Sequence, residues 1–189
     1  MGSMGLKGFK SFVIGSVTRY VLINSLKPIL VVKPLQWKTM GKLNLLFATD
    51  GSEHAVKTGK FLISMPFPED TEMTILNVIT SPYMDMPDWL HVKIEEMGKM
   101  EVAEIKVEEL KYSEGIIDDA KIDMGTRFKK ITGLTRSGDP AQEIITVSNY
   151  LKSDIIATGS RGMRGAKGML GSVSRNILGH SECSVLIGK

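Results

Sequence analysis

The chain is poor in the residue types that most often reveal a function: it has one cysteine and three histidines among 189 residues. A single cysteine excludes an internal disulfide and fits a reducing compartment. Cys183 stands just before the last apolar run, where we expect a small buried thiol rather than a reactive one. No two histidines are three or four residues apart, so no metal site made by side chains is predicted.

The net charge is also small, and long apolar runs are scarce. The net charge is only +3 and no basic tract exists, which argues against a nucleic-acid partner. The most apolar stretch, residues 11–32, is interrupted by polar residues and by Pro28, so no membrane span is expected. Because no small-residue cleavage site follows it, a signal peptide fits poorly.

Common catalytic and nucleotide motifs are missing as well. The absence of Gly-x4-Gly-Lys-[Ser/Thr] argues against a P-loop NTPase, and no Gly-x-Gly-x-x-Gly turn follows the first strand. No local motif suggests a Ser/His/Asp arrangement. We therefore predict that the protein is not an enzyme and that any turnover of a bound ligand is slow or absent.

What the sequence does contain is a regular alternation of strand and helix patterns. Apolar runs predict strands at residues 43–48, 73–79, 128–135, 154–158 and 184–187. Segments between them predict helices at residues 53–64, 88–118, 141–151 and 173–178. This order selects an α/β fold with a doubly wound parallel sheet and helices on both faces. Ligands of such sheets bind beyond the carboxyl ends of the strands, where the strand order reverses.

Two passages of the chain repeat each other at an offset of 156 residues. Gly15-Ser-Val-Thr-Arg19 matches Gly171-Ser-Val-Ser-Arg175, and Ile29-Leu-Val-Val-Lys33 matches Val185-Leu-Ile-Gly-Lys189. Agreement of this length predicts duplication rather than chance. We therefore interpret residues 1–33 as the closing helix and strand of a truncated preceding copy, 34–42 as a linker and 43–189 as a complete domain. Met1-Gly2-Ser3 is compatible with an expression leader or with the native start of the first glycine pattern.

A glycine-rich turn precedes the last predicted helix. Glycines 159, 162 and 171 allow backbone N–H groups to approach an anion closely, and Ser172 is expected to cap the helix. Arg161, Arg164 and Lys167 would add positive charge nearby. The alternative is a surface loop with an ordinary serine cap, but its place after a strand favours a phosphate site.

Asp50 follows the first predicted strand in the turn Thr49-Asp-Gly-Ser52. A carboxylate there can accept hydrogen bonds from ribose hydroxyls or hold a metal-bound water. The alternative is that Asp50 or Ser52 only caps the following helix. Both turns lie at carboxyl ends of strands, so they can face one ligand.

These segments together, with Ile75-Leu-Asn-Val78-Ile and Gly138-Asp-Pro, resemble the universal stress protein family over residues 43–189. The resemblance implies a three-layer sheet of five parallel strands (Rossmann-like, of the adenine nucleotide alpha hydrolase type), a cytoplasmic location, a homodimer formed through the terminal strands, and a stress-response regulatory or chaperone-like role. It implies ATP, or AMP or ADP, as ligand, with Mg²⁺ held through the phosphates. In that family's ATP-binding branch, Asp50 would face the ribose or metal, the Val78 backbone would contact adenine, and Thr158 and Gly159 would flank the nucleoside. The phosphates would be held by Gly162, Gly171, Ser172, Val173 and Ser174.

One departure from that pattern keeps a second interpretation open. The family spacing between the second and third glycines is nine residues, whereas eight residues separate Gly162 from Gly171. One missing residue shifts the chain by up to ~3.5 Å, although Gly165 and Gly168 give the loop freedom to compensate. The alternative is a nucleotide-free, dimerising interaction module. Gly2, Gly5, Gly15 and Ser16 keep the nine-residue spacing, but their copy lacks the other strands of a pocket.

The apolar segment at residues 28–32 would be an unsafe exposed edge if it stayed unpaired. We therefore predict that it pairs with a terminal strand, residues 184–187, of this chain or of a partner.

Overall fold

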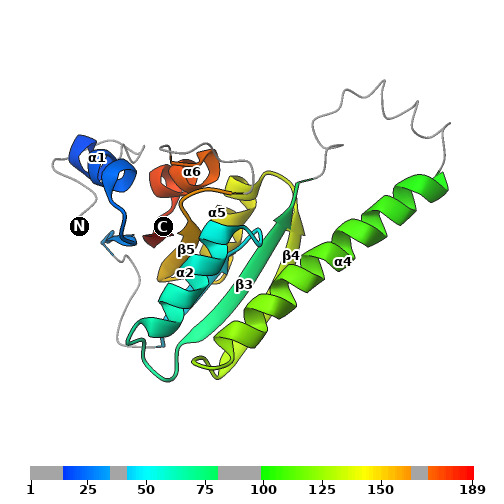
Figure 1. Cartoon of the computed structure of the whole chain (residues 1–189), viewed down its shortest axis with the longest axis horizontal. Coiled ribbons are helices and arrows are strands. Elements are labelled where there is room, and N and C mark those ends of the chain that lie inside the picture. The colour runs from blue at the N-terminus through cyan, green and yellow to red at the C-terminus, as the bar shows by residue number, and fades with distance from the viewer. Residues whose placement is uncertain (1–14, 35–41, 81–98, 163–169) are drawn as a thin grey trace.

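The computed structural model describes residues 15–34, 42–80, 99–162 and 170–189. It is a three-layer α/β structure around a six-stranded sheet with the order β1-β6-β5-β2-β3-β4 (Figure 1). The strands are β1 (Ile29–Val31), β2 (Asn44–Ala48), β3 (Glu72–Ile79), β4 (Lys130–Ser137), β5 (Ile155–Gly159) and β6 (Ser184–Gly188). The helices are α1 (Ser16–Asn24), α2 (Glu53–Ser64), α4 (Lys99–Met124), α5 (Pro140–Tyr150) and α6 (Ser172–His180).

Five of the strands, β2 to β6, are parallel, as the sequence predicted. Their apolar residues are buried because helices cover both faces of the sheet. On one face α2 and α4 pack over a cluster that includes Phe47, Leu62 and Met124. On the other face α5 and α6 pack over a cluster that includes Ile144, Ile156 and Ile177.

The strand order reverses beside β2. The chain leaves β2 toward β3 on one side, and β5 later pairs with β2 on the other side. The carboxyl ends of β2 and β5 therefore form the switch point at which ligands of open α/β sheets bind. The turns that carry Asp50 and Gly159 start there.

Two helix starts are fixed by side-chain caps. Ser52 caps α2 by accepting a hydrogen bond from the Ala55 amide at 3.3 Å. Asp139 caps α5 by accepting one from the Gln142 amide at 2.8 Å. A cap of this kind satisfies an amide that the helix itself leaves without a partner.

The sixth strand is β1, which the prediction of a five-stranded parallel sheet did not contain. It pairs antiparallel with β6 of the same chain over Ile29–Val31. The expected pairing of residues 28–32 with the terminal strand is thus confirmed for the chain's own strand. Most of the predicted linker, residues 35–41, lies outside the described residues.

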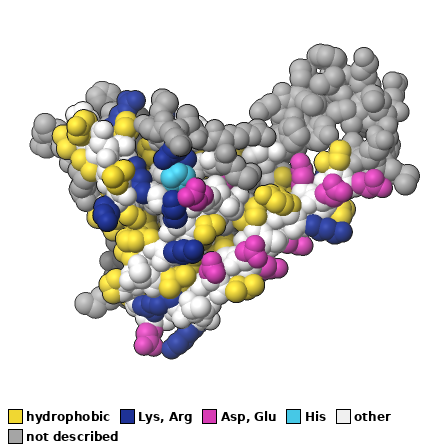
Figure 2. All heavy atoms as spheres, viewed as in Figure 1, with side chains coloured by type: hydrophobic (Ala, Val, Ile, Leu, Met, Phe, Trp, Pro, Cys, Tyr) yellow, Lys and Arg dark blue, Asp and Glu magenta, His cyan; other side chains and the backbone are white. Residues whose placement is uncertain are grey.

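The predicted helix at 88–118 was wrong at its end. α4 continues to Met124, and its first predicted turns at residues 88–98 lie outside the described residues. Ile105 and Leu110, expected on the packed face, are 38% and 47% exposed, whereas Ile117 and Met124 are buried. The reason is that the first part of α4 projects past the strand ends (Figure 1). Acidic and apolar side chains alternate along its surface (Figure 2).

The predicted strand at 128–135 runs two residues later, as β4 at Lys130–Ser137. In the part of the chain that the structure describes, no helix is long and apolar enough to cross a membrane.

Candidate functional site

The turns after β2 and β5 meet at the switch point. The Asp50 carboxylate accepts a hydrogen bond from the Ser52 amide at 3.0 Å through Oδ1. Its other oxygen lies so near Gly162 that a Cβ on this glycine would be 2.7 Å from Oδ2. Gly51 has φ +75°, a conformation that suits glycine, and lets the turn fold back. The structure therefore brings together two of the residues that the sequence nominated.

Ser160 ties the second turn to its surroundings. Its amide donates to the Gly188 carbonyl at 3.0 Å, and its carbonyl accepts from the Gly171 amide at 2.8 Å. Gly159 lies against the start of α2, where a Cβ would be 3.0 Å from the Ala55 nitrogen. These contacts hold Gly159 and Gly171 on either side of one buried residue.

The start of α6 differs from the prediction. Gly171, not Ser172, is the N-cap residue, with φ −59° and ψ 154°, and no side chain caps the helix. Ser172 is the first helical residue and is exposed. The expectation that the Ser172 hydroxyl caps α6 was therefore wrong: a glycine already occupies the extended cap position. The first amides of α6, at Ser172 and Val173, receive no side-chain cap, and the helix dipole makes their surroundings favourable for an anion.

Two other nominated side chains are directed into the protein. Ser174 is buried, and its hydroxyl donates to the Gly159 carbonyl at 2.7 Å. Thr158 is buried within β5, in register with Ala48 and Ile187. The Ser174 hydroxyl therefore helps to hold the glycine turn, and both side chains are buried rather than exposed.

Val78 lies near the carboxyl end of β3, the strand beside β2. The preceding residue, Asn77, is buried and donates from Nδ2 to the Thr49 carbonyl at 2.7 Å. Asn77 thus fixes the turn that carries Asp50. The sequence analysis did not single it out, because an asparagine inside an apolar strand indicates a hydrogen bond without showing its partner.

His54 and Arg161 also belong to this region. His54 Nδ1 and Ser160 Oγ are 3.3 Å apart. Burial, and then the positive charges of Arg161 and Lys57, lower the pKa of His54. No role for His54 could be predicted from the sequence, because its contact is with a residue far along the chain. Arg161 contributes its carbonyl as an acceptor for the Ser52 hydroxyl at 3.4 Å.

The described residues hold no group of three or more His, Cys, Asp or Glu side chains that could bind a metal ion. The remaining nominated residues of the loop, Arg164, Gly165, Lys167 and Gly168, lie outside the described residues, as do Gly2 and Gly5.

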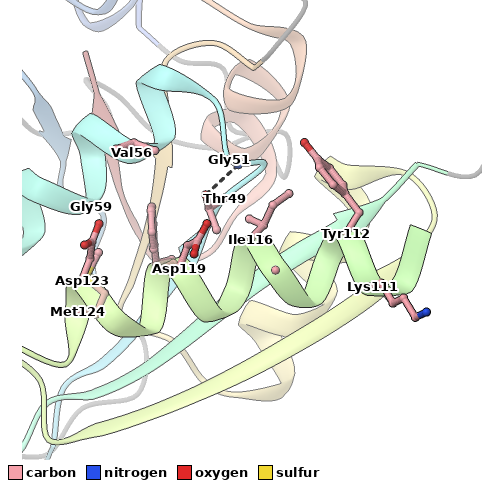
Figure 3. Close-up of a pocket in the computed structure, with 13 residues that line it drawn as sticks. Thr49, Gly51, Val56, Gly59, Lys111, Tyr112, Ile116, Asp119, Asp123 and Met124 are labelled. Atoms are coloured by element: carbon pink, nitrogen blue, oxygen red, sulfur yellow. Dashed lines mark hydrogen bonds between the residues drawn. The ribbon is translucent and has the colours of Figure 1, made fainter. Parts of the chain in front are cut away.

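A cavity of about 480 Å³ lies between α2 and α4. Figure 3 shows Asp123 near Gly59 at one end of it and Tyr112 at the other, with Thr49 and Gly51 between them, while the Lys111 side chain points away. The cavity reaches the first turn but includes none of the glycines at 159, 162 and 171. It is therefore distinct from the meeting point of the two turns.

The chain is similar to known proteins both in sequence and in structure. The model of the universal stress protein family matches residues 43–189. The universal stress protein YxiE of Bacillus subtilis is 28% identical over 144 residues, which cover 76% of this chain and 96% of YxiE.

Solved structures share the fold. Hypothetical protein MJ0577 is 26% identical with a TM-score of 0.64, and the match covers 77% of this chain and 94% of that one. A universal stress protein from Archaeoglobus fulgidus, 22% identical with a TM-score of 0.63, matches 100% of this chain and 60% of its own length.

Two similar structures hold nucleotides. One is a universal stress protein in complex with cAMP, 16% identical with a TM-score of 0.53, covering 79% of this chain and 98% of that one. The other is a family member from Arabidopsis thaliana with AMP bound, 14% identical with a TM-score of 0.55, covering 78% of this chain and 91% of that one.

Proposed function

Since the chain belongs to the universal stress protein family, we propose that it is a regulatory protein that binds an adenine nucleotide at its switch point. The observation that carries the proposal is the meeting of Asp50 with Gly162 beside the uncapped start of α6. A carboxylate can accept hydrogen bonds from ribose hydroxyls, and a helix start favours the negative charge of phosphate groups.

Each group at this point has a separate role in the proposal. Asp50 would accept hydrogen bonds from the ribose hydroxyls. The amides of Ser172 and Val173 would donate to phosphate oxygens, and the close approach of Gly162 to Asp50 shows that no side chain fits between them. The backbone at Val78 would meet the adenine. Mg²⁺ would enter with the phosphates of ATP and reduce the repulsion between them and Asp50.

Two considerations favour an adenine nucleotide and a regulatory outcome. Structures of the same fold bind AMP and cAMP, which supports adenine as the base. No general base is evident in the sequence motifs, so binding would act by shifting a conformational equilibrium in a stress-response or chaperone-like role. The single reduced cysteine fits a reducing compartment such as the cytoplasm.

Isothermal titration calorimetry with AMP, ATP and ATP with Mg²⁺ tests the proposal. We expect saturable binding, and at least about a tenfold loss of affinity in Gly162→Val, because the valine displaces the Asp50 carboxylate from its hydrogen-bonding position. Gly115→Ala is the matched control, since nothing lies within 4 Å of its Cβ. Wild-type affinity in Gly162→Val would refute the assignment.

The second candidate is a nucleotide-free interaction module. The eight-residue spacing between Gly162 and Gly171 favours it. A bound ligand must raise the melting temperature by linkage. An unchanged melting temperature at millimolar AMP and ATP would therefore favour this second candidate.

A further inference from the structure

The cavity between α2 and α4 has no role in the proposed nucleotide site. Its volume of about 480 Å³ falls within the range of about 300–1,000 Å³ that is typical of pockets for small ligands. Residues of both helices and of β2 line it (Figure 3). The chemistry of these walls therefore indicates which kind of molecule can enter.

Two rows of residues on α4 give the cavity an apolar wall and an acidic rim. Within each row the residues are four positions apart, so they lie along one side of the helix. The apolar row is Ile116, Ala120 and Met124, and the other row is Gly115, Asp119 and Asp123. Met124 is buried, whereas both carboxylates are exposed. Figure 3 shows the two aspartate side chains directed from α4 toward α2.

The opposite wall is apolar as well. Val56 of α2 and the buried Phe47 of β2 line the cavity across from α4. Gly59 brings the two helices close together, because a Cβ there would lie 2.8 Å from Met124 Cε. An apolar body that enters the cavity is therefore held between apolar side chains and leaves water on both of its faces.

Gly115 leaves the rim open. A Cβ on this glycine would meet nothing within 4 Å, so packing does not require a glycine here. Glycine is also unfavourable inside a helix. Its effect at this position is to leave space beside Asp119, one turn further along the same row.

The two carboxylates of the rim have the same charge and no counter-charge nearby. Among the described residues, no ion pair joins Asp119 or Asp123 to a basic side chain. Like charges four positions apart on a helix repel each other and destabilise it. A cation bound between the two carboxylates would remove this repulsion.

Neighbouring lysines do not supply that cation. Lys121 pairs with Asp118 at 3.0 Å, and Lys57 pairs with Glu53 at 2.6 Å. Among the described residues that line the cavity, Lys111 is the single basic one, and its side chain points away from it (Figure 3). The cavity therefore combines apolar walls with a negative rim.

We propose that this cavity binds a small organic cation with an apolar body, of the arylalkylamine class. The apolar body packs between Phe47, Val56 and Ile116. The ammonium group donates hydrogen bonds to Asp119 and Asp123, which hold it at the rim. The same carboxylates repel the phosphates of a nucleotide, so the two sites take ligands of opposite charge.

Amide NMR spectra of the whole chain during titration with three probes test the proposal. The probes are 4-phenylbutylamine, its neutral counterpart 4-phenylbutan-1-ol, and methylammonium. We expect the amine to shift the amides of Gly59, Gly115 and Ile116 with a Kd of about 1 mM or lower, and to leave Ser172 and Val173 unchanged. The alcohol should bind at least about fivefold more weakly, and methylammonium should not saturate.

A matched pair of variants tests the role of the rim. The double variant Asp119→Asn with Asp123→Asn should bind the amine about tenfold more weakly and the alcohol as before, because only the charge is lost. It should fold, since the change removes a repulsion. Asp118→Asn is the control: it removes a carboxylate from the same helix but does not line the cavity, so amine affinity should stay unchanged.

Four results would overturn the proposal. The amine and the alcohol could bind equally well, or methylammonium could bind as well as the amine. The folded double variant could keep the wild-type affinity for the amine. Finally, the amine could cause no saturable shift at the cavity, or shift only the amides around Asp50, which would place it at the switch point.

Discussion

At the scale of single residues, Lys33 combines burial with charge. Its side chain is 2% exposed and donates to two backbone carbonyls and to the Ser181 hydroxyl. Burial lowers the pKa of Lys33 from 10.5 to about 8, and the neighbouring Cys183 opposes this only in part. The hydrogen bonds satisfy the ammonium group, but they do not remove the cost of taking it out of water.

The lowered pKa of Lys33 predicts how stability changes with pH. Between about pH 8 and pH 10.5 the unfolded chain keeps a proton that the folded chain has lost, so the free energy of unfolding rises with pH. The gain is at most about 3 kcal/mol. Urea denaturation of the wild type and of Lys33→Met at pH 7.5 and 9.5 measures it. The wild type should gain relative to the variant, and the difference includes the charge interaction between Lys33 and Cys183, which the variant lacks. If the free energies of unfolding of the two proteins change equally between pH 7.5 and pH 9.5, folding does not lower the pKa of Lys33.

Individual residues of the candidate site were predicted to different degrees. Asp50 and Gly162 were nominated from their positions after strands, and the structure brings them together. The prediction that Ser172 caps α6 was wrong by one position. Gly171 and Ser172 are two small residues in a row, and the sequence alone does not show which of them precedes the helix. The hydrogen bond from the Ser174 hydroxyl to the Gly159 carbonyl could not be predicted from the sequence, because it depends on how α6 is placed relative to the end of β5. Cys183 is buried and burial raises its pKa, as expected of an unreactive thiol.

At the scale of elements, α2 and β6 approach each other closely at Gly188. A Cβ on Gly188 would lie 1.8 Å from Thr58 Oγ1 and 3.0 Å from the Thr58 Cα. The backbone of the helix is therefore part of the contact, and a side-chain rotation cannot relieve it. This approach seats the start of α2 against the turn that follows β5.

Gly188→Ala should therefore be destabilising. We expect a loss of about 1–3 kcal/mol in the free energy of unfolding, because the methyl group forces α2 away from the sheet. Chemical denaturation measures the loss. Gly115→Ala, in open space on a helix, should be neutral or stabilising by up to ~1 kcal/mol. Equal stability of the two variants would mean that α2 moves freely over β6.

Elements were predictable where local chemistry sets their limits. Pro66 follows the end of α2 closely, and Pro140 with Asp139 starts α5, so these limits agreed within one residue. The limits of α4 and β4 were not predictable in this way. Among the α4 side chains that the structure describes, from residue 104 onward, only those in the second half of the helix are buried, so only that part shows a buried apolar face. The antiparallel direction of β1 depends on a contact across the whole chain and has no local pattern.

At the scale of the whole molecule, the switch point and the repeat are separate features. The switch point follows from the order of β5, β2 and β3 and provides the proposed nucleotide site. The repeat closes the β6 edge at the side of the sheet. The fold and the family could be predicted from the sequence because glycines and apolar runs at fixed intervals define them. The occupant of the β6 edge could not be chosen, since own-chain and partner pairing use the same residues.

The central claim is that an adenine nucleotide binds where the two turns meet. The most direct test is nuclear magnetic resonance of the backbone amides during titration with AMP and with ATP and Mg²⁺. We predict the largest shifts at Gly162, Ser172 and Val173, with little change in β1. Shifts confined to the α2–α4 cavity, around Lys111 and Asp119, would contradict the claim, as would the absence of any shift at millimolar nucleotide.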